Sequence, residues 1–505
     1  MKAFLLHRER DFEFEREPPP AAAELVQDLE LESLFQAMAG GDRFLLEVAR
    51  KVVLASLYDV PEILYRQDVL RDCLRNAATV RALYALAVET IERERKNYWG
   101  LLSRNPGFVL HRSVEVLHMF VEMLRRLRQQ AEAHAEDFES EGFRTLFASL
   151  RRELDEAYLG QIEAHLARLK FRHGVLLSAR LGKGNAGADY VLRRPHDDER
   201  PWLRRLLTRG PPAYTFYIHE RDEAGAAAVA ELRDRGIHLV ANAAAQSNEH
   251  ILSFFRMLRA ELGFYVGCLN LYEKLSAKGA PICFPVPAPA AERRHRARDL
   301  YDVCLELKRE GRAVGNDLAA DGKALFLITG ANQGGKSTFL RSLGLAQLMM
   351  QSGMFVPARS FCANICSGLF THYRREEDAA RRAGKLEEEL QRASAIVDRL
   401  APDGLILFNE SFQSTNEREG SEIGRQIIAA LLESRIKVFC VTHLHDLARS
   451  LYERGLDEAL FLRAEWREDG VRTFKILPGA PLPTSHGKDL FEQIFGGTSR
   501  SSASA

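Results

Sequence analysis

The sequence predicts a fold of class α + α/β, in which long helices over residues 29–278 are followed by an α/β domain over residues 279–480. Proline is rare between about residue 29 and residue 176, and apolar residues recur there every three or four positions, as in amphipathic helices. Residues 251–272 contain a strict heptad, which is typical of helices that pack against each other. From Gly279 onward, short β-rich runs alternate with helical segments, which is α/β patterning.

Composition excludes several classes of protein. The chain has 505 residues with 70 Lys and Arg against 70 Asp and Glu, so a global attraction to nucleic acid or membrane is not encoded and binding to a polyanion must be local. Hydrophobic residues at 46% and charged residues at 28% exclude wholesale disorder. Seven cysteines without a CxxC pair predict neither a disulfide framework nor a zinc site, and the longest apolar runs are too short to span a membrane. We therefore expect a cytoplasmic protein in a reducing compartment.

The helical region contains two clear apolar patterns. Residues 1–28 form a lead, of which residues 1–20 are expected to be an appendage or a small edge element, because three prolines end it. One apolar stripe comprises Val114, Leu117, Phe120 or Val121, Leu124 and Leu127. The heptad comprises Ile251, Phe255, Leu258, Leu262, Tyr265, Leu269 and Tyr272. Three heptads are short for an autonomous coiled coil, so a helical core within the chain is the favoured interpretation.

Residues 168–212 interrupt the helices with glycines, two short β-rich runs (residues 175–177 and 190–192) and many basic residues. Over residues 168–210, 11 Lys and Arg face four acidic residues, an excess of seven positive charges. This excess is compatible with a solvated, charge-rich excursion and with local binding of phosphate groups. The candidate DNA contacts are Arg168, Lys170, Arg172, Arg180, Lys183, Arg193 and Arg194.

A phosphate-binding motif follows a predicted strand over residues 324–329. Residues 330–338, GANQGGKST, satisfy GxxxxGK[ST] and precede a predicted helix. In such a loop, the backbone N–H groups hold phosphate oxygens, Lys336 adds a charge at the β- and γ-phosphates, and Ser337 can ligate Mg²⁺. The candidate nucleotide-binding residues of the loop are Gly330, Asn332, Gly334, Gly335, Lys336, Ser337 and Thr338.

Two later strands end in residues that suit ATP hydrolysis. The predicted strand over residues 405–408 ends in Asn409 and Glu410, where Asn409 is a candidate Mg²⁺ ligand and Glu410 can orient or deprotonate the attacking water. Most P-loop enzymes have Asp in place of Asn409, so we expect weaker Mg²⁺ binding. The predicted strand over residues 438–442 leads to His443, which can sense a γ-phosphate or polarise water.

The order of these segments resembles that of the MutS family of DNA mismatch-repair ATPases. The matching segments are GANQGGKST, SGMFVPA (residues 352–358), LILFNES (residues 405–411) and VTHLHDL (residues 441–447). Residues 314–317, VGND, lie where that family places a nucleotide-contacting segment, which makes Asn316 a candidate ATP contact. Residues 64–70, LYRQDVL, are similar to the arginine-glutamine helix of the family's lever domain.

The resemblance implies an ABC-type ATPase domain, helical levers, and a DNA clamp inserted at the basic excursion. It also implies a homodimer in which each ATP is completed across the interface, with Glu410 and His443 as catalytic residues. Gly384 occupies the position of the family's signature-loop serine and lacks the hydroxyl. Short flanking segments lead us to expect a truncated member without a mismatch-reading or nuclease domain, and residues 481–505 are expected to form a short helix around residues 491–495 and a disordered tail.

The expected function is ATP binding and hydrolysis, with Mg²⁺, that control a DNA-binding clamp in mismatch repair or recombination. Such a clamp would recognise DNA by its backbone and shape. Asn409 and Gly384 also motivate a different class, a nucleotide-gated dimeric scaffold that scarcely hydrolyses ATP and binds a protein partner. An ABC ATPase of the transporter or chromosome-organising type is disfavoured, because the sequence has no LSGGQ segment. Cys362 and Cys366 are either a redox pair or buried thiols, with buried thiols favoured.

Overall fold

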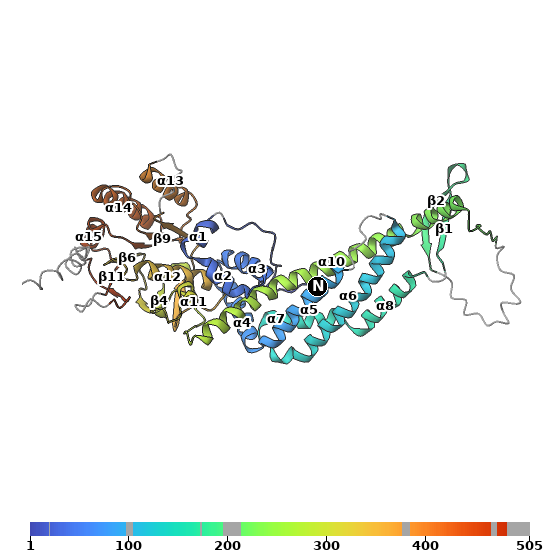
Figure 1. The fold of residues 1–505 in the computed structure, drawn as a ribbon, viewed down its shortest axis with the longest axis horizontal. Helices are drawn as coiled ribbons and strands as arrows, with labels where there is room; N and C mark the ends of the chain where they lie inside the picture. Colours follow the sequence, from blue (N-terminus) through green and yellow to red (C-terminus); the bar gives the residue numbers. More distant parts are fainter. Residues whose placement is uncertain are drawn as a thin grey trace, which may run out of the picture. The chain divides into compact units, whose positions relative to one another are not determined.

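The computed structural model describes residues 1–19, 21–96, 105–171, 174–194, 214–375, 384–465 and 472–481. It confirms the predicted fold class, because long helices precede a domain of mixed sheets and helices (Figure 1). The chain divides into two compact units. One comprises residues 1–3, 81–137 and 144–259, and the other comprises residues 4–80, 138–143 and 260–505.

The first unit is mainly helical. Its helices are most of α5 (Ala77–Lys96), α6 (Pro106–His134), most of α7 (Glu141–Glu153), α8 (Glu156–Leu169) and the first part of α10 (Glu223–Ala277), with a 3₁₀ turn η1 (Ala135–Asp137). Helix α6 starts where the Asn105 side chain accepts a hydrogen bond from the Phe108 N–H at 3.1 Å, with a proline as the first helical residue. The predicted stripe lies on α6 and is buried. Its Phe120 ring stacks on Phe255 of the heptad, with ring centroids 6.3 Å apart.

The basic excursion forms a β-hairpin. Strands β1 (Leu176–Leu181) and β2 (Gly187–Arg193) pair antiparallel, joined by the 3₁₀ turn η2 (Lys183–Asn185). Both short strands predicted in this stretch are therefore confirmed. In the hairpin, Leu177 of β1 lies against Gly236 of α10, so the hairpin packs on the helix that follows it.

The second unit begins with a segment that is part of the core. The helices α1 (Ala22–Asp28), α2 (Leu31–Ala39), α3 (Arg43–Leu54) and α4 (Val60–Arg75) follow it. Leu5 and Leu6 are fully buried, and their N–H groups donate to the Glu261 carboxylate at 2.6 and 3.3 Å. The Arg66 guanidinium donates to the Leu6 carbonyl oxygen at 3.0 and 3.1 Å. The sequence predicts that residues 1–20 are an appendage or a small edge element. The appendage alternative is wrong for this segment, because partners distant in the sequence satisfy its backbone. Residues 1–19 also contain no strand.

Two sheets form the α/β part of this unit. The six-stranded sheet has the order β12-β11-β6-β10-β9-β8, and only β12 is antiparallel to its neighbour. Its strands are β6 (Leu325–Thr329), β8 (Leu369–Tyr373), β9 (Leu405–Asn409), β10 (Lys437–Val441), β11 (Ala459–Ala464) and β12 (Ile476–Pro478). The four-stranded sheet has the order β3-β7-β4-β5, with β3 (Val286–Ala288), β4 (His295–Leu300), β5 (Asn316–Ala319) and β7 (Ser360–Asn364).

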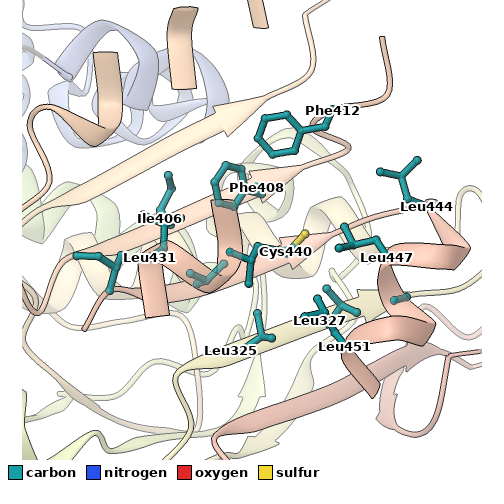
Figure 2. Packing of buried hydrophobic residues seen from close by; sticks show 14 of the residues in the cluster. Leu325, Leu327, Ile406, Phe408, Phe412, Leu431, Cys440, Leu444, Leu447 and Leu451 are labelled. Atoms are coloured by element: carbon teal, nitrogen blue, oxygen red, sulfur yellow. The ribbon is translucent and has the colours of Figure 1, made fainter. Parts of the chain in front are cut away.

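Helices cover both faces of the six-stranded sheet (Figure 1). Helix α12 (Lys336–Gln351) lies on one face, and α13 (Lys385–Val397), α14 (Glu417–Glu433) and α15 (His445–Glu453) lie on the other. Helix α11 (Val303–Lys308) contacts α2, and the turn η3 (Ala290–Glu292) contacts β7 of the four-stranded sheet. Alternate strand residues such as Leu325 and Leu327 pack with Leu431, Leu447 and other residues of α14 and α15 (Figure 2). Burial on both faces explains why these strands are continuous apolar runs in the sequence.

The parts of the chain that the structure describes contain neither a candidate membrane-spanning helix nor a candidate metal-binding cluster. None of their helices is both long and apolar enough to cross a membrane. They also contain no group of three or more His, Cys, Asp or Glu side chains that could hold a metal ion. Cys362 in β7 and Cys366 both have free thiols. Cys366 is buried as favoured, whereas Cys362 is only half-buried, so the prediction of two buried thiols is wrong for Cys362.

Candidate nucleotide site

Three parallel strands bring the predicted catalytic segments to one edge of the six-stranded sheet. β6 leads into the glycine-rich loop, β9 ends at Asn409, and β10, which lies between them, leads to His443. In register, Val441 of β10 pairs with Asn409 on one side and with Ile328 on the other. The carboxyl ends of parallel strands are where open α/β sheets bind ligands, so the sheet itself assembles these segments.

The glycine-rich loop has the backbone conformation of a phosphate cradle. Gly330 and Gly335 have φ angles of 116° and 89°, which favour glycine. A Cβ atom on Gly330 would lie 3.0 Å from the backbone nitrogen of Ala464, and one on Gly335 would lie 3.3 Å from the Cβ of Phe474. Helix α12 begins at the next residue, so its free N–H groups point toward the loop. These features fit bound phosphate.

Lys336 lies within the loop that it is expected to serve. Its side chain is 4% exposed, and Nζ donates hydrogen bonds to the carbonyl oxygens of Gly330 and Ala331 at 2.9 and 2.8 Å. Burial lowers the pKa of Lys336 from 10.5 to about 8, although the Glu410 carboxylate opposes this shift. The ammonium group is thus poorly solvated and close to where an anion would bind.

The side chains of Ser337 and Asn409, the two predicted Mg²⁺ ligands, are in contact. The Ser337 hydroxyl donates a hydrogen bond to Asn409 Oδ1 at 2.9 Å. Both residues are half-buried. The pair places two neutral oxygen atoms together, and oxygen is the ligand atom that Mg²⁺ prefers. The donor set fits a magnesium ion but supplies no negative charge from this pair.

Glu410 and His443 also meet. His443 Nε2 lies 3.0 Å from Glu410 Oε1, and we assign the proton to Nε2 because the carboxylate can only accept. This hydrogen bond lowers the pKa of Glu410 below its usual value, and Lys336 acts in the same direction, so the carboxylate is ionised near neutral pH. Glu410 has a φ of 55° and its N–H donates to the Val441 carbonyl oxygen at 2.9 Å.

A cavity of about 180 Å³ lies beside the loop. Its lining includes Tyr301, Asn316, Gln333, Thr338 and Phe474. The Asn316 amide accepts a hydrogen bond from the Ile476 N–H at 2.8 Å and donates to the Phe474 carbonyl oxygen at 3.3 Å. Asn316 therefore holds the segment that presents Phe474. Sequence reasoning missed Phe474, because no motif marks it and it lies more than one hundred residues after the loop that it covers.

The remaining predicted loop and signature residues lie as follows. Asn332 is exposed, Gly334 is half-buried, and a Cβ on Gly334 would lie 2.8 Å from the Cβ of Ala464. Gly384 is the N-cap of α13 and has open space around it. The buried Glu389 lies on the same helix.

The predicted DNA contacts are exposed wherever the structure describes them. On the hairpin, Arg180 lies in β1 near the turn, Lys183 lies in the turn, and Arg193 and Arg194 lie at the other end of β2 and directly after it. Arg168 lies in the last turn of α8, and Lys170 forms an ion pair with Glu115 at 3.0 Å. Arg172 lies outside the described residues, as does the helix expected around residues 491–495.

The fold and the site define a P-loop domain of the ATPase class, preceded by long helices. Residues 326–488 match the family domain described as MutS domain V, and residues 58–278 match the one described as MutS2 N-terminal domain. The chain belongs to the MutS family and carries the ATPase domain of that family, which confirms the resemblance seen in the motifs.

Several curated relatives are similar to part of this chain. The DNA mismatch repair protein MutS of Syntrophomonas wolfei is 36% identical over 185 residues, which are 35% of this chain and 21% of that protein. The protein of the same name from Caulobacter vibrioides is 33% identical over 165 residues, 32% of this chain and 18% of the relative. The one from Clostridium botulinum is 29% identical over 218 residues, 39% and 23% respectively. The chain thus matches about a fifth of the length of these relatives.

Proposed function

We propose that this protein binds ATP with Mg²⁺, hydrolyses it, and uses the nucleotide cycle to control a DNA-binding clamp. The observation that carries the ATPase proposal is the pair of contacts at the carboxyl edge of the sheet, Ser337 with Asn409 and Glu410 with His443. They support a site in which Ser337 and Asn409 offer oxygen atoms to the metal and Glu410 is an ionised carboxylate near the phosphate-binding loop.

The chain's own groups divide the chemistry as follows. Lys336 exchanges its two carbonyl partners for phosphate oxygens, and the anionic ligand then offsets the cost of burying its ammonium group. Ser337 and Asn409 would hold Mg²⁺, which when bound neutralises phosphate charge. Glu410 orients the attacking water and accepts its proton, while His443 fixes the Glu410 carboxylate.

The cavity beside the loop supports binding of the base of the nucleotide. Phe474 offers an aromatic side chain that is 42% exposed, and Asn316 holds its backbone in place. Stacking on an aromatic ring suits the flat face of a purine. Gln333 and Thr338, which belong to the loop, add polar groups to the lining of the cavity.

The basic hairpin supports the DNA part of the proposal. Residues 176–194 contain four basic residues and one acidic residue, Asp189, and the basic residues are exposed. Contacts to phosphates give affinity without sequence information, so the proposed clamp prefers a DNA shape, as in branched or distorted duplex. A homodimer, the clamp-like insertion at residues 168–212 and the domain limits at residues 278 and 480 belong to the same proposal.

ATP hydrolysis measured with and without DNA tests this proposal. The wild-type protein is compared with the Glu410→Gln variant in the presence of Mg²⁺ and of perfect duplex, mismatched duplex or a four-way junction. Hydrolysis that requires Glu410 and changes with one class of DNA supports a DNA-coupled ATPase. If hydrolysis requires Glu410 but has the same rate with every DNA, the proposed ATPase activity stands and the proposed control of a DNA-binding clamp is refuted.

A scaffold that holds ATP without turnover is the second candidate. It is favoured by the neutral Ser337–Asn409 pair and by Gly384, which brings no hydroxyl to the start of α13. Its signature would be ATP-dependent dimerisation with no phosphate release above that of the Glu410→Gln variant. In that case, a protein partner would bind the ATP-bound and ATP-free forms with different affinities.

A further inference from the structure

The turn after β9 has a strained backbone conformation, which must be stabilised by contacts with neighbouring residues. Glu410 and Phe412 have φ angles of 55° and 64°, a region that residues with a side chain rarely occupy. Ser411 and Phe412 are 5% and 3% exposed, so the turn is held against the protein interior. Figure 2 shows Phe412 beyond Phe408 at this end of the core, and their ring centroids are 5.7 Å apart. The direction of the Glu410 carboxylate depends on this turn.

Helix α13 supplies one support. Glu389 on this helix is 6% exposed, and its Oε1 accepts a hydrogen bond from the Phe412 N–H at 2.5 Å. Its Oε2 is buried, and no side chain or backbone group among the described residues donates to it. The charge of Arg392 on the same helix interacts favourably with Glu389. One backbone hydrogen bond and this attraction still leave Oε2 without a donor among the described residues, so holding the turn through a buried carboxylate costs free energy. Costs of this kind concentrate at functional positions.

Strand β8 supplies a second support, which is connected to the first. His372 is fully buried, and burial lowers its pKa to about 4, so the ring is neutral near pH 7. Its Nε2–H donates to the Glu389 carbonyl oxygen at 3.1 Å. The Ser411 hydroxyl donates to the His372 backbone carbonyl oxygen at 2.7 Å and also lies 2.7 Å from His372 Nδ1, so it contacts both the backbone and the ring of His372. The His372 ring also stacks on Phe412, with centroids 5.5 Å apart and planes at 17°.

We propose that Glu389 is a positioning residue for ATP hydrolysis, which fixes the Glu410–Phe412 turn from α13 and thereby aims the Glu410 carboxylate. Together with His372 it links α13 to the residues that directly follow Glu410. A displacement of α13 is therefore transmitted to the group that activates water. The inference rests on the proposed function, because it assigns Glu410 to that step.

Three variants test the inference. Glu389→Ala removes the acceptor of the Phe412 N–H, and it should lower kcat at least about tenfold while the affinity for ATP changes less than about twofold. Glu389→Gln keeps an oxygen acceptor and should stay within about threefold of the wild-type kcat. Glu387→Ala is the matched control, because this glutamate lies on the same helix, is exposed, and accepts a hydrogen bond from Gln391 of that helix at 3.2 Å.

Amide hydrogen exchange over residues 410–413 provides a readout that does not need turnover. Faster exchange in Glu389→Ala than in Glu389→Gln and Glu387→Ala, together with the loss of kcat, supports the inference. A wild-type kcat in Glu389→Ala overturns it, and so does an equal loss of kcat and ATP affinity. If the wild type hydrolyses no more ATP than Glu410→Gln, the proposed function fails, and so does the role of Glu389 in positioning Glu410 for hydrolysis. Exchange then shows whether Glu389 still holds the turn, and unchanged exchange refutes that as well.

Discussion

The affinity for ATP should fall at alkaline pH because of Lys336. Burial lowers the pKa of Lys336 to about 8 in the protein without nucleotide. Only the ammonium form attracts phosphate, so the apparent dissociation constant is the intrinsic one divided by the protonated fraction. That fraction is about nine-tenths at pH 7 and about one-tenth at pH 9. The dissociation constant should therefore rise about tenfold over this range, a loss of about 1.4 kcal/mol.

Calorimetric titration with a non-hydrolysable ATP analogue at several pH values between about 7 and 9 measures this change. The matched control is Lys336→Arg, because a guanidinium stays protonated throughout the range. Its affinity should be weaker at pH 7 and almost independent of pH. A wild-type dissociation constant that changes less than about twofold, or a tenfold change in the arginine variant as well, would refute the reasoning.

Four further predictions concern the metal, the base, the core and DNA. Asn409→Asp should lower the Mg²⁺ concentration needed for half-maximal ATP binding, since it adds a charge beside the metal; an unchanged Mg²⁺ titration would contradict this. Phe474→Ala should cost about 1 kcal/mol or more of ATP affinity in calorimetry, whereas Phe474→Tyr should bind normally; equal affinities for both would exclude stacking. Leu327→Ala, at a fully buried site, should lower the free energy of unfolding in urea by about 2–5 kcal/mol, and a loss below about 1 kcal/mol would mean that the core is poorly packed there. Reversing the charges of Arg180 and Lys183 should weaken duplex binding and reduce the slope of log affinity against log salt by about 0.9 per lost phosphate contact; an unchanged slope would remove the hairpin from the DNA surface.

Local sequence signals predicted the fold class and the phosphate loop. The strands over residues 325–329, 405–409 and 437–441 are continuous apolar runs because helices cover both of their faces. Their parallel arrangement then brings Ser337 to Asn409, although 72 positions separate them in the sequence. A motif marks each of these residues, so the site could be assembled from order and strand polarity alone.

Contacts between distant segments without a motif could not be predicted. Leu5 is buried, and its N–H donates to Glu261, which lies 256 positions away in the sequence. Phe474 covers the loop because Asn316 binds its backbone. In both cases one polar side chain satisfies backbone groups of an irregular segment, and neither composition nor periodicity records such a pairing.

Phosphate release from ATP by the wild-type protein and by Glu410→Gln, with Mg²⁺ and without DNA, tests the central claim most directly. ATP binding is measured in parallel, so that a loss of turnover can be separated from a loss of affinity. The account predicts turnover by the wild type and a decrease on the order of 10²–10⁴-fold in the variant, with ATP affinity retained. Equal phosphate release by the two proteins would contradict the assignment of Glu410 as the group that activates water.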